Sequence, residues 1–246
     1  MNFSLYHTPE QTPTDTIPDC AIVIDVLRAT TTIAQAFSVG AEAVQAFSDI
    51  DQLLAMSEQW PAAQRIRIGE RGGKTVAGCD FGNSPRDCTP ERFAGCRIFM
   101  STTNGTRALQ RVQSAPVLLT AALTNRQRVV DYLLETQPNT VWFVASGWEG
   151  SFALEDTVCA GAVVHAVSKQ NGVALPALAA NDELVAAVAL FEHWQDQLVT
   201  LLHHASHGHR LLRLNNDADL QFCATLDSVN VLPMQRELGI LVNGAA

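Results

Sequence analysis

Short apolar runs alternate with segments of helical period along most of the chain. The clearest run, residues 20–25, contains the β-branched Ile22, Val23 and Ile24 and is typical of a buried strand. Apolar side chains at helical spacing follow at 33–37, and Gly40 is predicted to end that helix. Further strands are predicted at 43–47, 65–69, 96–101, 117–121 and 141–145, with an edge strand at 2–6 and closing strands at 229–232 and 238–242.

Helices are predicted between these strands, and they dominate the chain after about residue 181. The predicted helical ranges are 48–60, 107–113, 124–136, a helix from about 153, and then 184–204, 206–214 and 217–223. This order predicts an α/β fold, in which a mostly parallel or mixed sheet carries helices on both faces (three-layer α/β/α) and the C-terminal part is helical. We expect a single domain over 1–246, with 1–178 and 179–246 as its candidate lobes.

Polar and charged side chains follow four of the predicted strands. The four sets are Asp25, Arg28, Thr30 and Thr31; Glu70 and Arg71 with Asn83 and Ser84; Thr102, Thr103, Asn104, Gly105 and Thr106; and Ser146 and Glu149 with Glu155 and Asp156. Each threonine-rich turn alone is explained by helix capping. Because the carboxyl ends of parallel strands share one edge of a sheet, we expect the four sets to meet there.

Together the four sets supply carboxylates, arginines and neutral donors, which suits the hydrolysis of a phosphate ester. Asp and Glu oxygens hold a divalent metal, arginines bind phosphate oxygens, and hydroxyl and amide groups fill the remaining positions. The turns lack the G-x-x-x-x-G-K-[ST] and G-x-G-x-x-G spacings, which disfavours a P-loop or a dinucleotide site.

The composition limits the partners. The net charge is −9 and Lys74 and Lys169 are the only lysines, so a nucleic-acid surface is not supported. Hydrophobic residues make up 47% of the chain, enough for a large core, yet no apolar run is long enough to span a membrane. The polar N-terminal stretch predicts a cytoplasmic protein.

Histidines and cysteines offer weaker alternatives. His203 and His207 are spaced as a metal pair, but no Glu accompanies them as in H-E-x-x-H, which favours a structural or pocket-wall role. Cys79, Cys88 and Cys159 are candidate nucleophiles, but no C-x-x-x-x-x-R loop surrounds them.

Ordered motifs give the chain a resemblance to a known family. They are the residues of 23–32 (VIDVLRATTT), 69–72 (GERG), 82–85 (GNSP), 102–106 (TTNGT), 154–157 (LEDT) with Ala160 and Gly161, 206–208 (SHG), and Asp219 with Leu220. At these motifs the chain resembles the 2-phosphosulfolactate phosphatase family. The resemblance implies an α/β fold, a homodimer, and a Mg²⁺-dependent phosphatase that converts a small anionic phosphorylated substrate to 3-sulfolactate.

These expectations assign roles to the four polar sets. Asp25, Glu155 and Asp156, with Glu70 next, are the expected Mg²⁺ ligands; Arg28, Arg71 and the turn at 102–106 are expected to bind the phosphate and the distal sulfonate or carboxylate. Asp25, Arg28 and Glu149 are the expected catalytic residues, and Thr30, Thr31, Asn83, Ser84 and Ser146 complete the expected substrate site. A non-catalytic binding module for an acidic metabolite and a cysteine-dependent hydrolase are the alternative functions.

Overall fold

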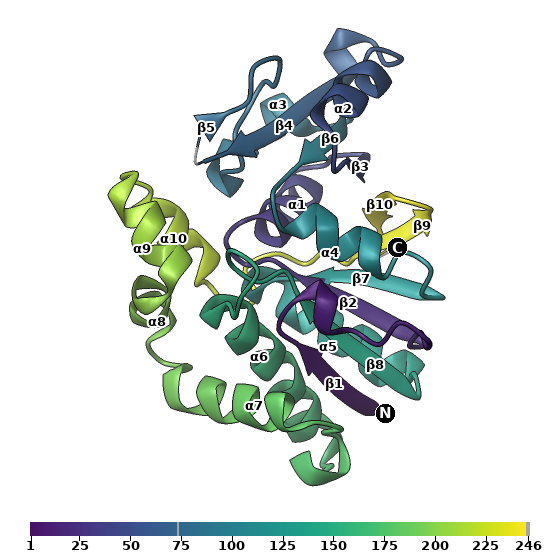
Figure 1. Cartoon of the computed structure of the whole chain (residues 1–246), viewed down its shortest axis with the longest axis vertical. Helices are drawn as coiled ribbons and strands as arrows, with labels where there is room; N and C mark the ends of the chain where they lie inside the picture. The colour runs from purple at the N-terminus through teal and green to yellow at the C-terminus, as the bar shows by residue number, and fades with distance from the viewer. Residues whose placement is uncertain (73, 245–246) are drawn as a thin grey trace.

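A ten-stranded mixed sheet forms the centre of the computed structural model, which describes residues 1–72 and 74–244 (Figure 1). This architecture confirms the predicted α/β class. The strands are β1 (Asn2–Tyr6), β2 (Cys20–Ile24), β3 (Ala43–Ala46), β4 (Arg65–Arg71), β5 (Lys74–Thr75), β6 (Arg97–Ser101), β7 (Val117–Ala121), β8 (Thr140–Ala145), β9 (Pro233–Glu237) and β10 (Ile240–Asn243).

The sheet consists of two parallel blocks joined by a C-terminal hairpin. The strand order is β1-β8-β2-β7-β9-β10-β3-β6-β4-β5, in which β1, β8, β2 and β7 form one parallel block and β3, β6 and β4 form the other. The antiparallel pair β9 and β10 lies between the blocks. The predicted strand at 229–232 is wrong: pairing begins only at Pro233, and the Leu232 amide donates instead to Asn243 Oδ1 at 3.0 Å.

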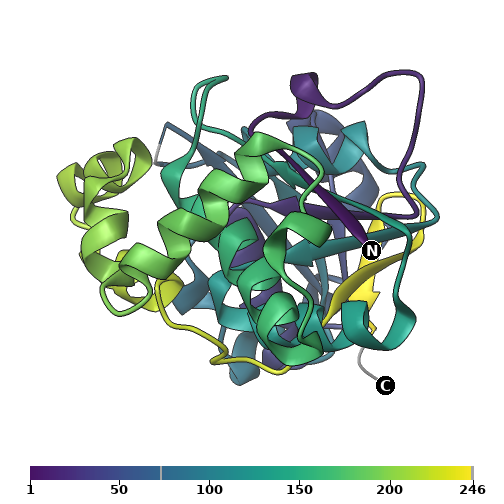
Figure 2. The same ribbon diagram turned by 90° about the horizontal axis from the view of Figure 1, so that it is seen from below.

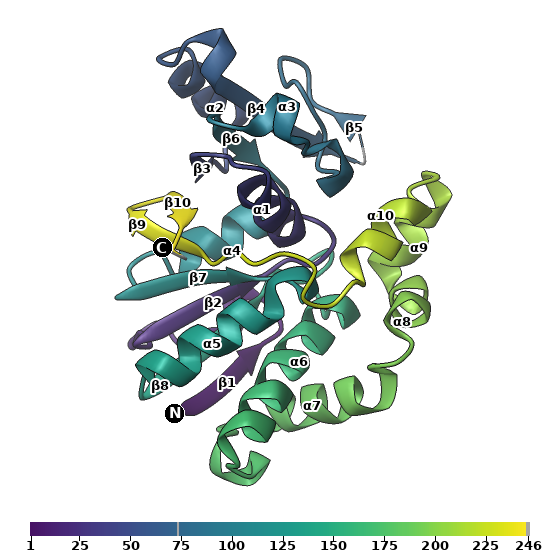
Figure 3. The same cartoon turned by 180° about the vertical axis from the view of Figure 1, so that it is seen from behind.

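Helices pack on both faces of the sheet, as Figures 1 and 3 show for α4 and α5. The helices of the described residues are α1 (Ala29–Ser38), α2 (Ile50–Ser57), α3 (Pro90–Phe93), α4 (Gly105–Arg111), α5 (Arg126–Thr136), α6 (Leu154–Asn171), α7 (Asp182–Trp194), α8 (Leu198–His204), α9 (Ser206–Arg213) and α10 (Asp217–Cys223). None of these helices is both long and apolar enough to cross a membrane.

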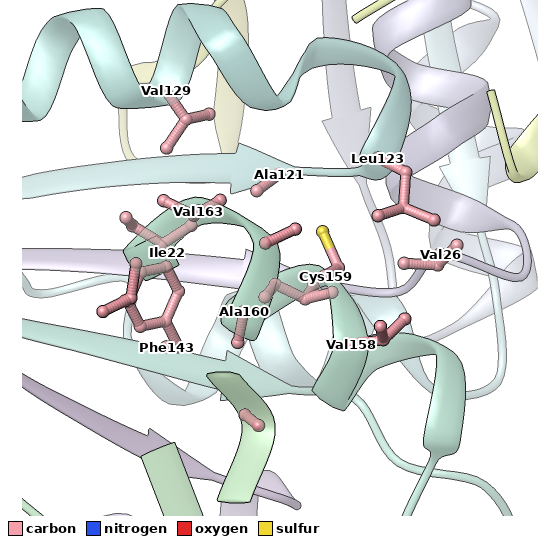
Figure 4. Packing of buried hydrophobic residues seen from close by; sticks show 14 of the residues in the cluster. Ile22, Val26, Ala121, Leu123, Val129, Phe143, Val158, Cys159, Ala160 and Val163 are labelled. Atoms are coloured by element: carbon pink, nitrogen blue, oxygen red, sulfur yellow. The ribbon is translucent and has the colours of Figure 1, made fainter. Parts of the chain in front are cut away.

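The strand β2 is buried along its whole length, because both of its faces are covered. Ile22 and Ile24 belong to the cluster that contains residues of α5 and α6, and Figure 4 shows Ile22 beside Val163 and Phe143 of that cluster. Ala21 and Val23 belong to the cluster on the opposite face, with residues of α1 and α4. Burying one such branched side chain stabilises the fold by about 1.5–3 kcal/mol, so β2 is firmly anchored where the polar turn begins.

Helices α7 to α10 form an arm beside the sheet. In Figure 2, α8 to α10 gather at the left of the molecule, and α7 runs across its front against α6. The predicted helix at 184–204 is wrong in its length, since α7 ends at Trp194 and α8 begins at Leu198. A turn in which the Gln197 amide donates to the Trp194 carbonyl lets both helices bury their apolar faces in one cluster.

A close approach of backbones sets the angle between α8 and α9. A Cβ on Gly208 would collide with the carbonyl oxygen of Leu202, so only glycine permits α9 to fold back at this corner. This corner directs α9 toward the carboxyl ends of the strands, where the candidate site lies.

Candidate active site

A cavity of about 210 Å³ lies at the carboxyl ends of the parallel strands. The register aligns Ile24 of β2 with Ala145 of β8, and Gly69 of β4 with Ser101 of β6, so the residues that follow these strands emerge at one edge. Of the predicted site residues, those that line the cavity are Asp25, Arg28, Glu70, Asn83, Thr102, Thr103, Asn104 and Glu149. Leu27, Gly72, Trp148, His207 and Arg210 complete the lining.

Asp25 follows β2 directly, and its side chain is only 7% exposed. The Ala29 amide donates to Asp25 Oδ1 at 3.2 Å, which fixes the carboxylate at the start of α1. Burial raises the pKa of Asp25; the neighbouring Glu155 and Glu70 carboxylates raise it further, while His207 lowers it. Asp25 therefore sits where an opposing positive charge would be strongly favoured.

The threonines after Asp25 build the turn and do not line the cavity. Thr30 Oγ1 accepts a hydrogen bond from the Asp25 amide at 3.1 Å, and Thr31 Oγ1 donates to the Val26 carbonyl at 2.8 Å. Both side chains are buried. Their hydroxyls satisfy backbone groups of the turn, which holds Asp25 and Arg28 in place.

Arg28 is 5% exposed and lies between two carboxylates. Its Nη1 is 2.5 Å from Asp219 Oδ2 of α10, and its Nη2 is 3.5 Å from Glu70 Oε2 of β4. Ser84 Oγ donates to the other oxygen of Asp219 at 2.8 Å. This network joins the turn after β2, the end of β4 and the helical arm.

The turn after β6 meets Asp25 from the other parallel block. A Cβ on Gly105 would lie 2.8 Å from Asp25 Oδ2, so the absence of a side chain lets the α4 backbone reach the carboxylate. Thr106 Oγ1 accepts from the Thr102 amide at 3.2 Å, and Thr102 Oγ1 accepts from the Thr106 amide at 3.3 Å. Thr103 and Asn104, outside this reciprocal pair, face the cavity.

Asp156, in the first turn of α6, is buried behind Asp25. It accepts hydrogen bonds from the Val26 amide at 2.9 Å and the Gly147 amide at 3.3 Å. Burial raises the pKa of Asp156 well above its ordinary value, and Glu155 and Asp25 add to the effect. Ser146, which directly follows β8, is fully buried.

Glu155 lies behind the cavity wall, next to His207, which lines the cavity. His207 Nδ1 is 3.7 Å from Glu155 Oε1, and the His207 ring stacks on Trp148 with centroids 3.8 Å apart. Glu155, Trp148 and His207 also line a second cavity of about 200 Å³. The stacked Trp148 and His207 rings thus border both spaces.

Arg71 lies at the end of β4 with its guanidinium turned toward β6. Its Nη2 donates to Ser101 Oγ at 2.9 Å and its Nη1 to the Glu70 carbonyl at 2.9 Å. Arg71 is close to the site, but it does not line the cavity as the structure stands.

Comparisons with known proteins bear on the identity of this site. A family model described as 2-phosphosulpholactate phosphatase matches residues 6–238. The chain belongs to the 2-phosphosulfolactate phosphatase family. A protein of Thermosynechococcus vestitus named "Probable 2-phosphosulfolactate phosphatase" is 60% identical over 96% of both chains, and one of the same name from Trichormus variabilis is 59% identical over 98% of both.

The structure adds residues to the candidate site that the roles assigned from the sequence omitted. Asp219, His207 and Arg210 all come from the helical arm, and Trp148 comes from the loop after β8. Asp219 and His207 stand in motifs that carry the family resemblance. His207 lines the cavity, as the predicted pocket-wall role requires, whereas His203 pairs with Asp217. Arg210 and Trp148 had no signal in the sequence, because only the packing of the arm against the sheet brings them to the cavity.

The oxygen atoms of the candidate site suit a hard divalent cation such as Mg²⁺. In the described residues, no three His, Cys, Asp or Glu side chains form a preformed metal cluster. Mg²⁺ is nevertheless commonly held by one or two carboxylates, with waters and substrate phosphate completing the shell. Asp25 and Glu70 line the cavity beside Asn83, whose buried Oδ1 has no hydrogen-bond partner, so these oxygen atoms fit such a cation.

The cysteines fit poorly with nucleophilic catalysis in this family member. Burial raises the pKa of Cys79, Cys88 and Cys159, which keeps each as a neutral thiol. None of the three lines the cavity.

Proposed function

We propose that this protein hydrolyses 2-phosphosulfolactate to 3-sulfolactate and inorganic phosphate, with Mg²⁺ as its cofactor. The observation that supports the proposal most strongly is the meeting of Asp25 with the turn after β6 across the Gly105 backbone. A buried carboxylate and a set of neutral donors then face one small cavity, as phosphate transfer to water requires. The names of the close relatives suggest the substrate.

The substrate's phosphate binds against the turn after β6. The Thr103 hydroxyl and the Asn104 amide group donate to phosphate oxygens, while the reciprocal pair of Thr102 and Thr106 keeps the turn rigid. Asp219 and Glu70 hold the Arg28 guanidinium at the edge of the same space. Because these groups are fixed before the substrate arrives, little reorganisation accompanies the reaction.

Asp25 and Glu70 are the cavity carboxylates that would hold Mg²⁺, with the Asn83 oxygen beside them. Glu155 and Asp156 remain predicted ligands, although both oxygens of Asp156 already accept backbone hydrogen bonds. When bound, the cation would offset the phosphate charge and favour ionised carboxylates at the site.

In the reaction, water adds to phosphorus as the bond between phosphorus and the substrate's C2 oxygen breaks. The water loses one proton and the departing oxygen gains one, and Asp25 and Glu149 are the cavity carboxyl groups available for these exchanges. Attack by Asp25 itself, giving a covalent aspartyl-phosphate, is the mechanistic alternative. The configuration at a chiral phosphorus separates the two routes: inversion indicates direct attack by water and retention indicates the covalent route.

The test is phosphate release from a panel of phosphorylated hydroxy acids, with Mg²⁺ and with EDTA. We expect 2-phosphosulfolactate to be the best substrate and EDTA to abolish the release. Tight binding without turnover would favour the binding-module alternative. Turnover that resists EDTA but is lost on thiol alkylation would favour a cysteine-dependent hydrolase.

The assembly and the location of the protein stay predictions of the family resemblance and of the sequence. A homodimer is expected, and sedimentation equilibrium of the purified protein checks it. A cytoplasmic location is expected as well, and fractionation of the source cells checks it.

A further inference from the structure

Arg210 is the cavity's second arginine, and its surroundings differ from those of Arg28. Among the described residues that line the cavity, Arg28 and Arg210 are the only lysine or arginine side chains. Two carboxylates already compensate Arg28. Within residues 1–72 and 74–244, no ion pair or hydrogen bond of the Arg210 guanidinium is found.

The Arg210 guanidinium lies near lining residues that follow strands of both parallel blocks, Trp148 after β8 and Gly72 after β4. Its Cζ is 5.8 Å from the centroid of the Trp148 ring, in the loop after β8. Its Nη2 is 3.7 Å from the position that a Cβ on Gly72 would occupy, at the end of β4. The aromatic face orients the planar cation and leaves its N–H groups available to a ligand.

Arg210 and the proposed phosphate position belong to different parts of the cavity lining. The phosphate position is built from Asp25 and the turn after β6, which touch each other at Gly105. Arg210 belongs instead to the helical arm, and its guanidinium lies near Trp148 and Gly72. A cavity of about 210 Å³ suits one small molecule, so a ligand with anions at both ends would engage both parts.

We propose that Arg210 is a specificity-determining residue, which binds the second anionic group of the substrate, a sulfonate or a carboxylate, and not its phosphate. This proposal rests on the proposed phosphatase function. The second anion replaces water at a cation that has no carboxylate partner in the described structure, so its binding does not require an existing ion pair to break.

The experiment compares three esters that share the C2 phosphate. They are 2-phosphosulfolactate, 2-phospholactate, which lacks the sulfonate, and isopropyl phosphate, which lacks both acidic groups. The variants are Arg210→Met, which removes the cation, Arg210→Lys, which keeps it, and Arg213→Met, an exposed arginine of the same helix that serves as the matched control.

We expect Arg210→Met to lower kcat/KM for 2-phosphosulfolactate by about 10- to 100-fold, mainly through KM, as the loss of a charged hydrogen bond predicts. The kcat/KM of this variant for isopropyl phosphate should stay within about threefold of the wild-type value, because this ester has no second anionic group for Arg210 to bind. Arg210→Lys should recover part of the loss, and Arg213→Met should match the wild type. A loss for 2-phospholactate as large as that for 2-phosphosulfolactate assigns the carboxylate to Arg210, and a much smaller one assigns the sulfonate.

Two outcomes would overturn the proposal. Equal losses of kcat/KM for all three esters would mean that Arg210 acts on the phosphate. No loss for any ester would mean that Arg210 does not contact the substrate. Calorimetric binding of 3-sulfolactate and of inorganic phosphate tests Arg210 without turnover. We expect Arg210→Met to weaken the binding of 3-sulfolactate only. If the wild-type protein hydrolysed none of the esters, the proposed function would fail, and this binding comparison would still decide the role of Arg210.

Discussion

The turn after β2 and the turn after β6 share a sequence pattern but use their threonines differently. In the first turn Thr30 and Thr31 are buried and bond to the backbone, so the charged Asp25 and Arg28 are the groups that face the cavity. In the second turn Thr102 and Thr106 bond to each other's amides, and the uncharged Thr103 and Asn104 line the cavity together with Thr102. Threonines after a strand therefore do not by themselves identify a ligand site; their exposure does.

The largest expected effect comes from removing the charge of the first turn. Asp25→Asn should lower kcat by about 10²–10⁴-fold, because the carboxylate both faces the cavity and exchanges protons in the proposed reaction. The fold should survive, since burial already disfavours the ionised side chain. Phosphate release and thermal unfolding of the purified variant measure the two effects. A variant that kept activity within tenfold of wild type would remove Asp25 from the mechanism.

The next effect concerns the support of the first turn by the helical arm. Asp219→Ala should destabilise the protein by about 3 kcal/mol, because the buried Arg28 loses its closer carboxylate. Activity should fall as well, since Arg28 would no longer be held at the cavity. Urea unfolding gives the free energy. The comparison variant is Asp217→Ala, which removes a half-buried carboxylate of the same helix that pairs with His203 and not with Arg28. A change below about 1 kcal/mol would mean that Glu70 alone holds Arg28.

The contact between the two turns can be tested at Gly105. Gly105→Ala would bring a methyl group within 2.8 Å of both Asp25 Oδ2 and Ala29 Cβ. Overpacking of this kind costs about 1–3 kcal/mol, and we expect a comparable loss of transition-state stabilisation in kcat/KM. Unchanged kinetics together with a lower free energy of unfolding would show that the two turns pack together without acting together.

A pair of matched substitutions separates the two uses of threonine. Thr31→Val removes a hydroxyl that bonds to the Val26 carbonyl and should destabilise the protein by about 1–2 kcal/mol with little change in KM. Thr103→Val, at an exposed position, should leave stability within about 0.5 kcal/mol and raise KM by about tenfold. The comparison would fail if the two variants exchanged these effects.

The smallest expected effect is a pH dependence of stability at the buried carboxylates. The pKa of Asp156 is raised in the folded protein, so the folded state binds its proton more tightly than the unfolded state does. Its contribution to stability is fully present below the unfolded pKa of about 3.9 and is lost as pH rises toward the folded pKa. In EDTA, Asp156→Asn should therefore flatten the fall of the unfolding midpoint above pH 4. Equal slopes for this variant and the wild type would contradict the expectation, and Asp15→Asn, at an exposed position, serves as the control.

Much of the sheet could be predicted from local patterns, and the prediction failed where pairing is non-local. The runs of β2, β7 and β8 are apolar enough to show as buried strands. No local pattern shows that the hairpin of β9 and β10 inserts between the two parallel blocks. Similarly, the break between α7 and α8 at Gln197 lies inside a continuous helical period of the sequence. The burial of the apolar faces of both helices in one cluster explains the break.

The candidate site could be predicted only in part, for the same reason. Residues that directly follow strands, such as Asp25 and Asn104, were identified because strand ends are visible in the sequence. Asp219 and Arg210 lie on short amphipathic helices, where a charged residue ordinarily faces solvent. Their approach to the cavity depends on the corner at Gly208, which local spacing does not reveal.

A crystal structure with Mg²⁺ and vanadate, a mimic of the phosphate under attack, tests the central claim most directly. The account predicts that vanadate binds between Asp25 and the turn after β6, with its oxygen atoms on Thr103 and Asn104 and with Mg²⁺ on the Asp25 carboxylate. Vanadate bound in the second cavity behind Trp148 and His207, with the space between the two turns empty, would contradict it.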